Sequence, residues 1–230
     1  MLPARGNTVA IIPCLNEARA IGAVVVALRP FVRETLVIDD GSTDGTAAVA
    51  SAAEATVCRL ERSVGKGAAL AVGWTAAANH GAEWVLLLDG DGQHDPLDAP
   101  GLFAVATEGV RLVVGNRMSQ AAAMPWLRRQ TNRWMSRRIS ALAGISIPDS
   151  QCGFRLAHLP SLQQAGLSSR KFEIESEMLV AFARAGWGVG FAPVQVRYRD
   201  ECSKISPLRD TLRWIRWYRS AAAATRPSGG

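Results

Sequence analysis

The chain has 230 residues, of which 48% are hydrophobic and 20% charged, as expected of one α/β domain with an ample core. No apolar run approaches the roughly 20 residues of a membrane-spanning helix, and residues 1–8 lack the apolar stretch of a signal peptide. The four cysteines form no CxxC pair and the three histidines no ligand spacing. We therefore expect reduced structural thiols in the cytoplasm rather than a zinc site or disulfides. We expect His94 on the surface or in a turn.

Strands and helices are predicted to alternate along the first half of the chain. We expect strands at 8–12, 36–39, 56–60, 84–88 and 112–114, and helices near 17–28, 67–79 and 97–107. Another helix follows residues 42–44, which resemble an N-cap. This alternation predicts an α/β fold with a mostly parallel central sheet and helices on both faces.

The net charge of +6 is divided unevenly between the two halves. Residues 1–125 hold nine Lys and Arg against thirteen Asp and Glu, a net charge of −4. Residues 126–230 hold seventeen against seven, a net charge of +10. A basic second half favours a polyanionic partner. Nucleic acid, an anionic membrane surface and a phosphorylated substrate all fit this charge.

Two helices of the second half, predicted at 125–142 and 207–219, interleave arginine with large apolar side chains. We interpret them as interfacial helices that lie on an anionic membrane without spanning it. The alternative is that each helix packs on the core of this domain and its arginines are simply solvated. In the second helix we expect an apolar stripe and three aromatic side chains at headgroup level: Leu208, Leu212 and Ile215, then Trp214, Trp217 and Tyr218.

Three predicted strands end in polar clusters. The first leads into Asn16 and Glu17, the second into Asp40, and the strand at 84–88 into Asp89 and Asp91. Ligands of such folds bind at the carboxyl ends of the strands, so we expect these clusters to share one rim. Two carboxylates at a strand end suit Mg²⁺ or Mn²⁺, which takes one or two protein carboxylates plus substrate phosphates.

A glycine-rich loop, residues 62–68, precedes the predicted helix at 67–79. Its glycines and Lys66 before a helix N-terminus make it a candidate phosphate neighbour. It is not a Walker A loop, which requires GxxxxGK[ST], because Gly67 follows Lys66. A P-loop ATPase is therefore not favoured.

These blocks, in this order and spacing, resemble family-2 glycosyltransferases of the GT-A fold. They are Pro13 with Asn16-Glu17, residues 39–46, Gly65-Lys66-Gly67 and residues 89–96, continued by residues 115–117, 149–155, 172–177 and 203–204. Within the family the chain is most similar to dolichyl-phosphate mannosyltransferases and bacterial polyprenyl-phosphate glycosyltransferases. The resemblance implies one domain over 1–224, with a nucleotide-sugar half at about 1–118, an acceptor half at about 119–224 and a disordered tail at 225–230.

The resemblance also implies roles for individual residues. The nucleotide-sugar would contact Pro13, Asn16, Glu17, Asp40, Lys66 and Asp89. The cation would be held by Asp89, Asp91 and Gln93, and the acceptor phosphate by Arg117, Arg128, Asn132, Arg155 and Lys204. Asp91, Arg117 and Asp149 would take part in catalysis. Asp149 is either a general base or a buried carboxylate that orients Arg155.

The implied reaction moves a sugar, with inversion, from a UDP- or GDP-sugar to a polyprenyl or dolichyl phosphate at the cytoplasmic membrane face. The chain would dock peripherally or with a separate membrane protein. A phosphate acceptor needs no strong general base, because its second pKa is about 6. A soluble or polysaccharide acceptor is one alternative, and a non-catalytic scaffold another. A nucleic-acid-binding protein is not favoured, because the clustered aspartates would repel a polyanion.

Overall fold

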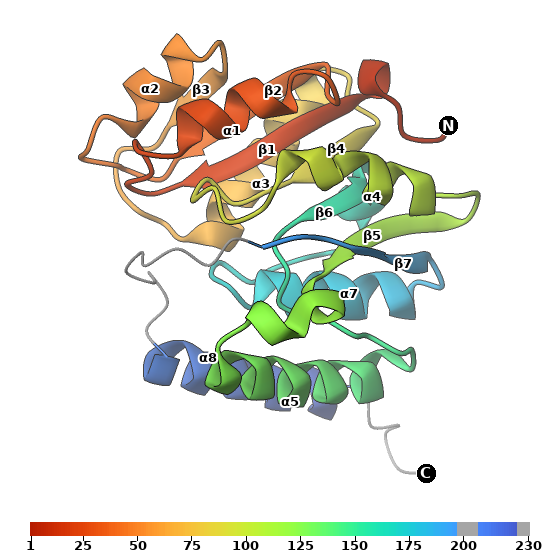
Figure 1. Ribbon diagram of the computed structural model, residues 1–230. Coiled ribbons are helices and arrows are strands. Elements are labelled where there is room, and N and C mark those ends of the chain that lie inside the picture. The colour runs from red at the N-terminus through yellow and green to blue at the C-terminus, as the bar shows by residue number, and fades with distance from the viewer. Residues whose placement is uncertain (197–206, 225–230) are drawn as a thin grey trace.

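The computed structural model describes residues 1–196 and 207–224 and contains one seven-stranded sheet with helices on both faces (Figure 1). The predicted α/β architecture is thereby confirmed. The strands are β1 (Thr8–Cys14), β2 (Glu34–Asp39), β3 (Thr56–Arg59), β4 (Trp84–Leu87), β5 (Val110–Asn116), β6 (Arg155–His158) and β7 (Gly188–Pro193). The helices are α1 (Ile21–Leu28), α2 (Thr46–Ala52), α3 (Lys66–Asn79), α4 (Ala99–Val105), α5 (Trp126–Ala143), α6 (Leu159–Gln164), α7 (Ile174–Arg184) and α8 (Pro207–Ala223), with 3₁₀ turns η1 (Arg5–Asn7), η2 (Pro96–Asp98) and η3 (Arg117–Ala123).

The strand order is β3-β2-β1-β4-β6-β5-β7. All neighbouring strands are parallel except β6, which runs antiparallel to both β4 and β5. At the centre, Ile11 of β1 pairs with Leu36 of β2 on one side and with Leu87 of β4 on the other. Because helices cover both faces, these central strands are buried on both sides and read as nearly continuous apolar runs.

The helices form layers around this sheet. In Figure 1, α1 and α4 lie in front of the sheet and α3 behind it. Helix α3 packs on β1 and β2, and α7 packs on β5 and β7. Helix α5 contacts α7, and α5 and α8 lie side by side as the outermost layer of the second half.

Three predicted helix boundaries are wrong in detail. Helix α1 begins at Ile21 rather than at residue 17, because Asn16 has a φ of +54° and the chain turns before the helix. Helix α2 begins at Thr46 after Gly45, so residues 42–44 precede the N-cap. The helix predicted at 97–107 is divided between η2 and α4.

Helix α8 packs on the domain through its aromatic side chains. Trp214 is 3% exposed, and its indole Nε1 donates a hydrogen bond to Ser176 Oγ at 2.9 Å. The prediction that this ring lies at headgroup level is therefore wrong. Trp217 and Tyr218 are half-buried against the core, and their predicted place at headgroup level stays a prediction. Leu212, expected in the apolar stripe, is 56% exposed. The side chain of Leu208 lies outside the described part of the chain.

Two further expectations concern membrane spans and cysteines. Across residues 1–196 and 207–224, no helix is both long and apolar enough to cross a membrane. Cys14, Cys58 and Cys152 are free thiols. Cys202 and the predicted tail at 225–230 lie outside the described residues.

The buried indole of α8 leads to a stability prediction. We expect Trp214→Ala to lower the free energy of unfolding by about 3–5 kcal/mol, because it leaves a cavity and removes the donor to Ser176. Urea unfolding followed by circular dichroism measures this change. Leu212→Ala, on the exposed side of the same helix, is the matched control and should change stability by less than about 0.5 kcal/mol. Equal effects of the two substitutions would show that α8 is not held through Trp214.

Candidate active site

The carboxyl ends of β1, β2 and β4 open into one cleft of about 440 Å³. The cleft is lined from the β1 end by Pro13 and Glu17, and from the β2 end by Asp40. Asp89 and Asp91 line it from the segment that follows β4. The predicted shared rim is therefore present, because the parallel pairing of β1 with both neighbours brings these ends together.

The loop after β1 is tied to the loop after β2 by hydrogen bonds. The Asn16 backbone N–H donates to Ser42 Oγ at 2.9 Å, and Asn16 Oδ1 accepts from the Thr43 N–H at 2.8 Å. The Glu17 N–H donates to Thr46 Oγ1 at 2.8 Å. Asn16 therefore holds the two loops in register, and Glu17 is the neighbour whose side chain lines the cleft.

Asp40 is buried and organises the next loop. Its carboxylate accepts hydrogen bonds from Ser63 Oγ at 2.8 Å, the Val64 N–H at 2.7 Å and the Gly65 N–H at 3.0 Å. Asp40 therefore fixes the path of the chain into α3, while it also borders the cleft.

The Gly65-Lys66-Gly67 loop is packed against the segment before α7. The Ala68 N–H donates to the Arg170 carbonyl at 3.1 Å. A Cβ on Gly67 would overlap the Ser169 carbonyl oxygen, so only glycine permits this approach. The Lys66 ammonium lies 2.5 Å from Asp89 Oδ1 and 2.5 Å from Glu175 Oε1.

Electrostatics keep Lys66 and Asp89 ionised. Burial opposes charge on both partners, but the two carboxylates raise the pKa of Lys66 above its ordinary value. Likewise burial raises the pKa of Asp89, yet the Lys66 ammonium outweighs it and holds that pKa below the usual range. Asp89 is therefore a carboxylate at neutral pH.

Asp91, Gln93 and His94 complete the wall after β4. Asp91 Oδ1 accepts from the Gln93 N–H at 3.0 Å, which closes a local turn at this wall. His94 is buried beside Phe154, with ring centroids 5.7 Å apart, so its predicted surface position is wrong. Burial lowers the pKa of His94 to about 4, and its Nδ1 has no hydrogen-bond partner among the described residues.

The donor set at this wall fits a hard divalent cation. Asp89 and Asp91 supply carboxylate oxygens and Gln93 an amide oxygen, all on the cleft. Within the described residues, no three His, Cys, Asp or Glu side chains form a complete metal cage. Mg²⁺ or Mn²⁺ bound here would need further oxygens, as is usual for sites that share the ion with substrate phosphates.

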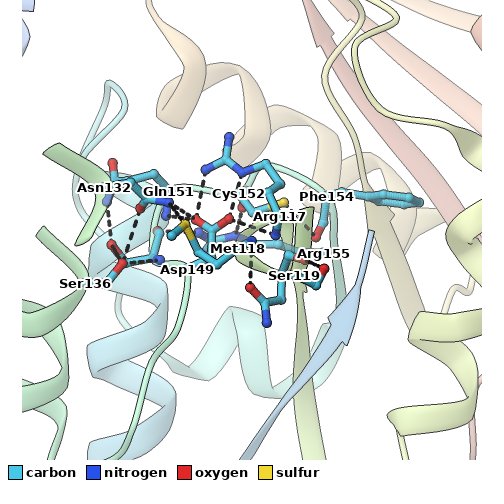
Figure 2. A network of polar contacts seen from close by, with 12 residues as sticks. Arg117, Met118, Ser119, Asn132, Ser136, Asp149, Gln151, Cys152, Phe154 and Arg155 are labelled. Carbon is cyan, nitrogen blue, oxygen red and sulfur yellow. Dashed lines mark hydrogen bonds and ion pairs between the residues drawn. The ribbon is translucent and has the colours of Figure 1, made fainter. Parts of the chain in front are cut away.

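Arg117, at the end of β5, is held by a buried carboxylate (Figure 2). Its Nε and one terminal nitrogen donate to the two oxygens of Asp149 at 2.7 and 2.8 Å, and its backbone N–H donates to Asp149 at 3.1 Å. Asn132 Nδ2 donates to the same carboxylate at 3.0 Å. Burial raises the pKa of Asp149, but the Arg117 guanidinium outweighs it and keeps that pKa low.

Only some residues of this network lie on the cleft, where the roles predicted for them require them to be. Arg117 lines the cleft, whereas Asp149 is fully buried and Asn132 is 4% exposed, and neither lines it. Asp149 pairs with Arg117 and not with Arg155, so the predicted partner was wrong. The Arg155 guanidinium is buried and donates to the carbonyls of Ser150, Cys152 and Glu175 at 2.6–3.0 Å.

The far end of the cleft is basic. Arg128 lines it as predicted, and Lys204 lies outside the described residues. Three cations and two carboxylates on the cleft were not predicted from the sequence. Arg209, Asp210 and Arg213 come from α8, Lys171 from the segment before α7, and Glu175 from the first turn of α7. Only the clustering of charges in residues 170–177 and 207–219 pointed to them.

Comparison with known proteins agrees with this geometry. Glycosyltransferase AglJ of Haloferax volcanii is 35% identical over 204 residues, which span 86% of this chain and 66% of AglJ. The UDP-N-acetylglucosamine–dolichyl-phosphate N-acetylglucosaminyltransferase of Methanococcus voltae is 27% identical over 83% of this chain and 85% of that enzyme. Glucosyl-3-phosphoglycerate synthase from Mycobacterium tuberculosis, solved with Mn²⁺ and UDP-glucose, superposes with a TM-score of 0.71 at 23% identity, covering 97% of this chain and 81% of that one.

The family assignment follows from a match that covers most of the chain. Residues 9–165 match the model of glycosyl transferase family 2, and they contain β1 to β6 with the rim carboxylates. The chain therefore belongs to glycosyltransferase family 2 and has the GT-A fold.

Proposed function

We propose that this glycosyltransferase moves a sugar, with inversion, from a UDP- or GDP-sugar to a polyprenyl or dolichyl phosphate. The observation that carries the proposal is the division of one cleft into an acidic and a basic end. Glu17, Asp40, Asp89 and Asp91 line the end below β1, β2 and β4. The basic end is lined by Arg117, Arg128, Lys171, Arg209 and Arg213, which outnumber the two carboxylates there, Glu175 and Asp210.

The acidic end suits the nucleotide-sugar. Pro13, Glu17 and Asp40 border it, and carboxylates there accept hydrogen bonds from a base or a ribose. Asn16 supports this wall from behind through its bonds to the 42–46 loop. Lys66 adds a cation at the inner edge, next to Asp89.

Asp89, Asp91 and Gln93 would hold Mg²⁺ or Mn²⁺ beside the diphosphate. Such a cation neutralises the charge that develops on the departing nucleoside diphosphate. The protein contributes by keeping Asp89 ionised through Lys66 and by holding Asp91 and Gln93 in one local turn on the cleft.

The basic end suits a phosphate that attacks the anomeric carbon. Arg117 presents a guanidinium whose orientation is fixed by Asp149, and Arg128 lines the same wall. Arginine binds phosphate oxygens in a planar, bidentate geometry. A phosphate acceptor is already ionised near neutral pH, so Asp149 need not act as a base, in keeping with its burial away from the cleft. We assign Asp149 and Asn132 to positioning Arg117.

The outer layer formed by α5 and α8 suits an anionic membrane surface. Helix α5 carries five arginines and no acidic residue, and its Arg133, Arg137 and Arg138 are exposed. On α8, Arg216 and Arg219 are exposed. At the start of α5, Trp126 and Leu127 are 65% and 70% exposed, next to the cleft residue Arg128. Basic and apolar side chains together favour peripheral binding to anionic lipid, on the cytoplasmic face in this proposal.

A soluble phosphorylated acceptor is the second candidate. Arginines recognise a phosphate whether or not a lipid is attached to it. The structurally similar glucosyl-3-phosphoglycerate synthase has been solved with phosphoglyceric acid, whereas the Methanococcus voltae relative is named for a dolichyl-phosphate acceptor. The lipid is favoured by the exposed apolar start of α5 and by the higher sequence identity of the Methanococcus voltae relative, 27% against 24%.

A donor-by-acceptor assay distinguishes these candidates. Purified protein with Mg²⁺ or Mn²⁺ receives UDP- and GDP-sugars with undecaprenyl phosphate in detergent, with phosphoglyceric acid, or with neither. We expect release of nucleoside diphosphate that requires undecaprenyl phosphate and the cation. Release that requires phosphoglyceric acid instead would establish the soluble acceptor. Absence of release in all arms would contradict the proposed reaction.

Removal of one strand-end carboxylate tests the metal site. We expect Asp91→Ala to lower cation-dependent turnover by at least about a hundredfold, since lost electrostatic stabilisation of a transition state typically costs that much. Its melting temperature should stay close to that of the wild type, because Asp91 lies on the cleft rather than in the core. Unchanged turnover with unchanged dependence on Mn²⁺ would remove Asp91 from the site.

The buried pair of Arg117 with Asp149 leads to a prediction on stability and pH. We expect Asp149→Asn to lower the free energy of unfolding at pH 7 by about 3–5 kcal/mol, because it leaves Arg117 buried without its counter-charge. The depressed pKa of Asp149 means that its contribution is present above the unfolded pKa of about 3.9 and is lost as the pH falls through the folded pKa.

The measurement is urea unfolding of both proteins from pH 7 down to the lowest pH at which they stay folded. The difference between wild type and Asp149→Asn should shrink as the pH falls below about 4. A difference that stays constant over that range would indicate that the ionised carboxylate is not what stabilises Arg117.

A further inference from the structure

Glu175 is a buried carboxylate that no part of the proposed reaction uses. It lies in the first turn of α7, and its side chain is 8% exposed. Its Oε1 is 2.5 Å from the Lys66 ammonium, which is also 2.5 Å from Asp89 Oδ1. One lysine of α3 thus joins a carboxylate of the acceptor half to a proposed cation ligand of the donor half.

The surroundings restrict where this lysine can go. The Lys66 side chain is 12% exposed, and its ammonium lies 5.8 Å from the centre of the Phe172 ring. The backbone of Gly153 packs so closely on Asp89 that a Cβ there would overlap Oδ2 of that carboxylate. An ammonium enclosed in this way has two charged partners, Asp89 and Glu175, and its position is a balance between them.

We propose that Lys66 and Glu175 are positioning residues that set the affinity of Asp89 for the divalent cation. Lys66 competes with the cation for the Asp89 carboxylate. Glu175 draws Lys66 away from Asp89, so that the carboxylate can turn to the ion when the ion and the diphosphate enter. This inference rests on the proposed metal-dependent function and adds to it a reason for Glu175.

A purely structural role gives a different expectation. If the cluster only holds α3 against α7, removing the charge of either Lys66 or Glu175 should lower the stability of the protein. Cation affinity should then be unchanged in both variants or reduced in both. If Lys66 competes for Asp89, loss of its charge should tighten cation binding, whereas loss of the Glu175 charge should weaken it. The two substitutions then act in opposite directions, which loss of a structural tie does not produce.

The test is a double-mutant cycle with Mn²⁺ alone as the probe, free Mn²⁺ being measured by its electron paramagnetic resonance signal. We expect Lys66→Gln to bind Mn²⁺ roughly tenfold more tightly, as the removal of one nearby positive charge implies. Glu175→Gln should bind it roughly tenfold more weakly for the converse reason. Lys66→Gln retains a hydrogen-bond donor toward both carboxylates, and Lys66→Met serves as a second variant if the first is unfolded.

The double variant separates action through Lys66 from direct attraction of the cation by Glu175. If Glu175 acts through Lys66, the variant that carries both substitutions should have the same Mn²⁺ affinity as Lys66→Gln alone. The effects of the two single substitutions would then be non-additive. Additive effects would overturn the positioning role. The matched control is Glu177→Gln. Glu177 lies on the same helix, and its carboxylate accepts hydrogen bonds from Ser168 and Ser169. The Mn²⁺ affinity of this variant should equal that of the wild type.

Failure of this inference and failure of the proposed function give different results. Wild-type protein that binds Mn²⁺, with variants that do not diverge, would overturn the roles of Lys66 and Glu175 alone. Wild-type protein that takes up no Mn²⁺, either alone or with UDP or GDP, would overturn the metal site, and this inference with it.

Discussion

Strand β4 pairs with β1 on one side and with β6 on the other, and this double pairing places Asp89 between the two halves of the cleft. The parallel side joins β4 to the strands whose ends carry Glu17 and Asp40. The antiparallel side joins it to β6, which leads back to the loop that holds Asp149 and Gly153. A carboxylate at this position faces both the proposed donor and the proposed acceptor, because the sheet changes direction there.

Buried ion pairs hold the two walls of the cleft, although burying charged groups carries a desolvation cost that apolar packing would avoid. Burying an ion pair is often neutral or unfavourable for stability compared with an apolar pair. Arg117 with Asp149 and Lys66 with Glu175 are nevertheless both buried and both within hydrogen-bond distance. Their benefit is orientation, since a guanidinium or ammonium fixed in advance loses less entropy when an anion binds.

The sequence predicted β1, β2 and β4 and their common edge well because the signals are local. Apolar runs that lead into Asp89 and Asp40 mark the ends of two strands. Because the strands are parallel, their carboxyl ends lie at the same edge of the sheet. The second half depends on long-range contacts that leave no periodic signal. Strand β6 has four residues and runs antiparallel, and the partner of Asp149 is Arg117, 32 residues away. Burial of His94 beside Phe154 is likewise decided by tertiary packing.

The same distinction explains why Trp214 of α8 was misplaced. From the sequence, a tryptophan next to arginines suits a membrane interface and a protein core equally, because its ring is apolar and its N–H is polar. Ser176 on α7 accepts the Trp214 N–H, so the indole can be buried without leaving its donor unpaired. The exposed apolar residues are instead Trp126 and Leu127, which begin α5 immediately before Arg128. Apolar contact with a lipid and recognition of its phosphate would then fall within three consecutive residues at the mouth of the cleft.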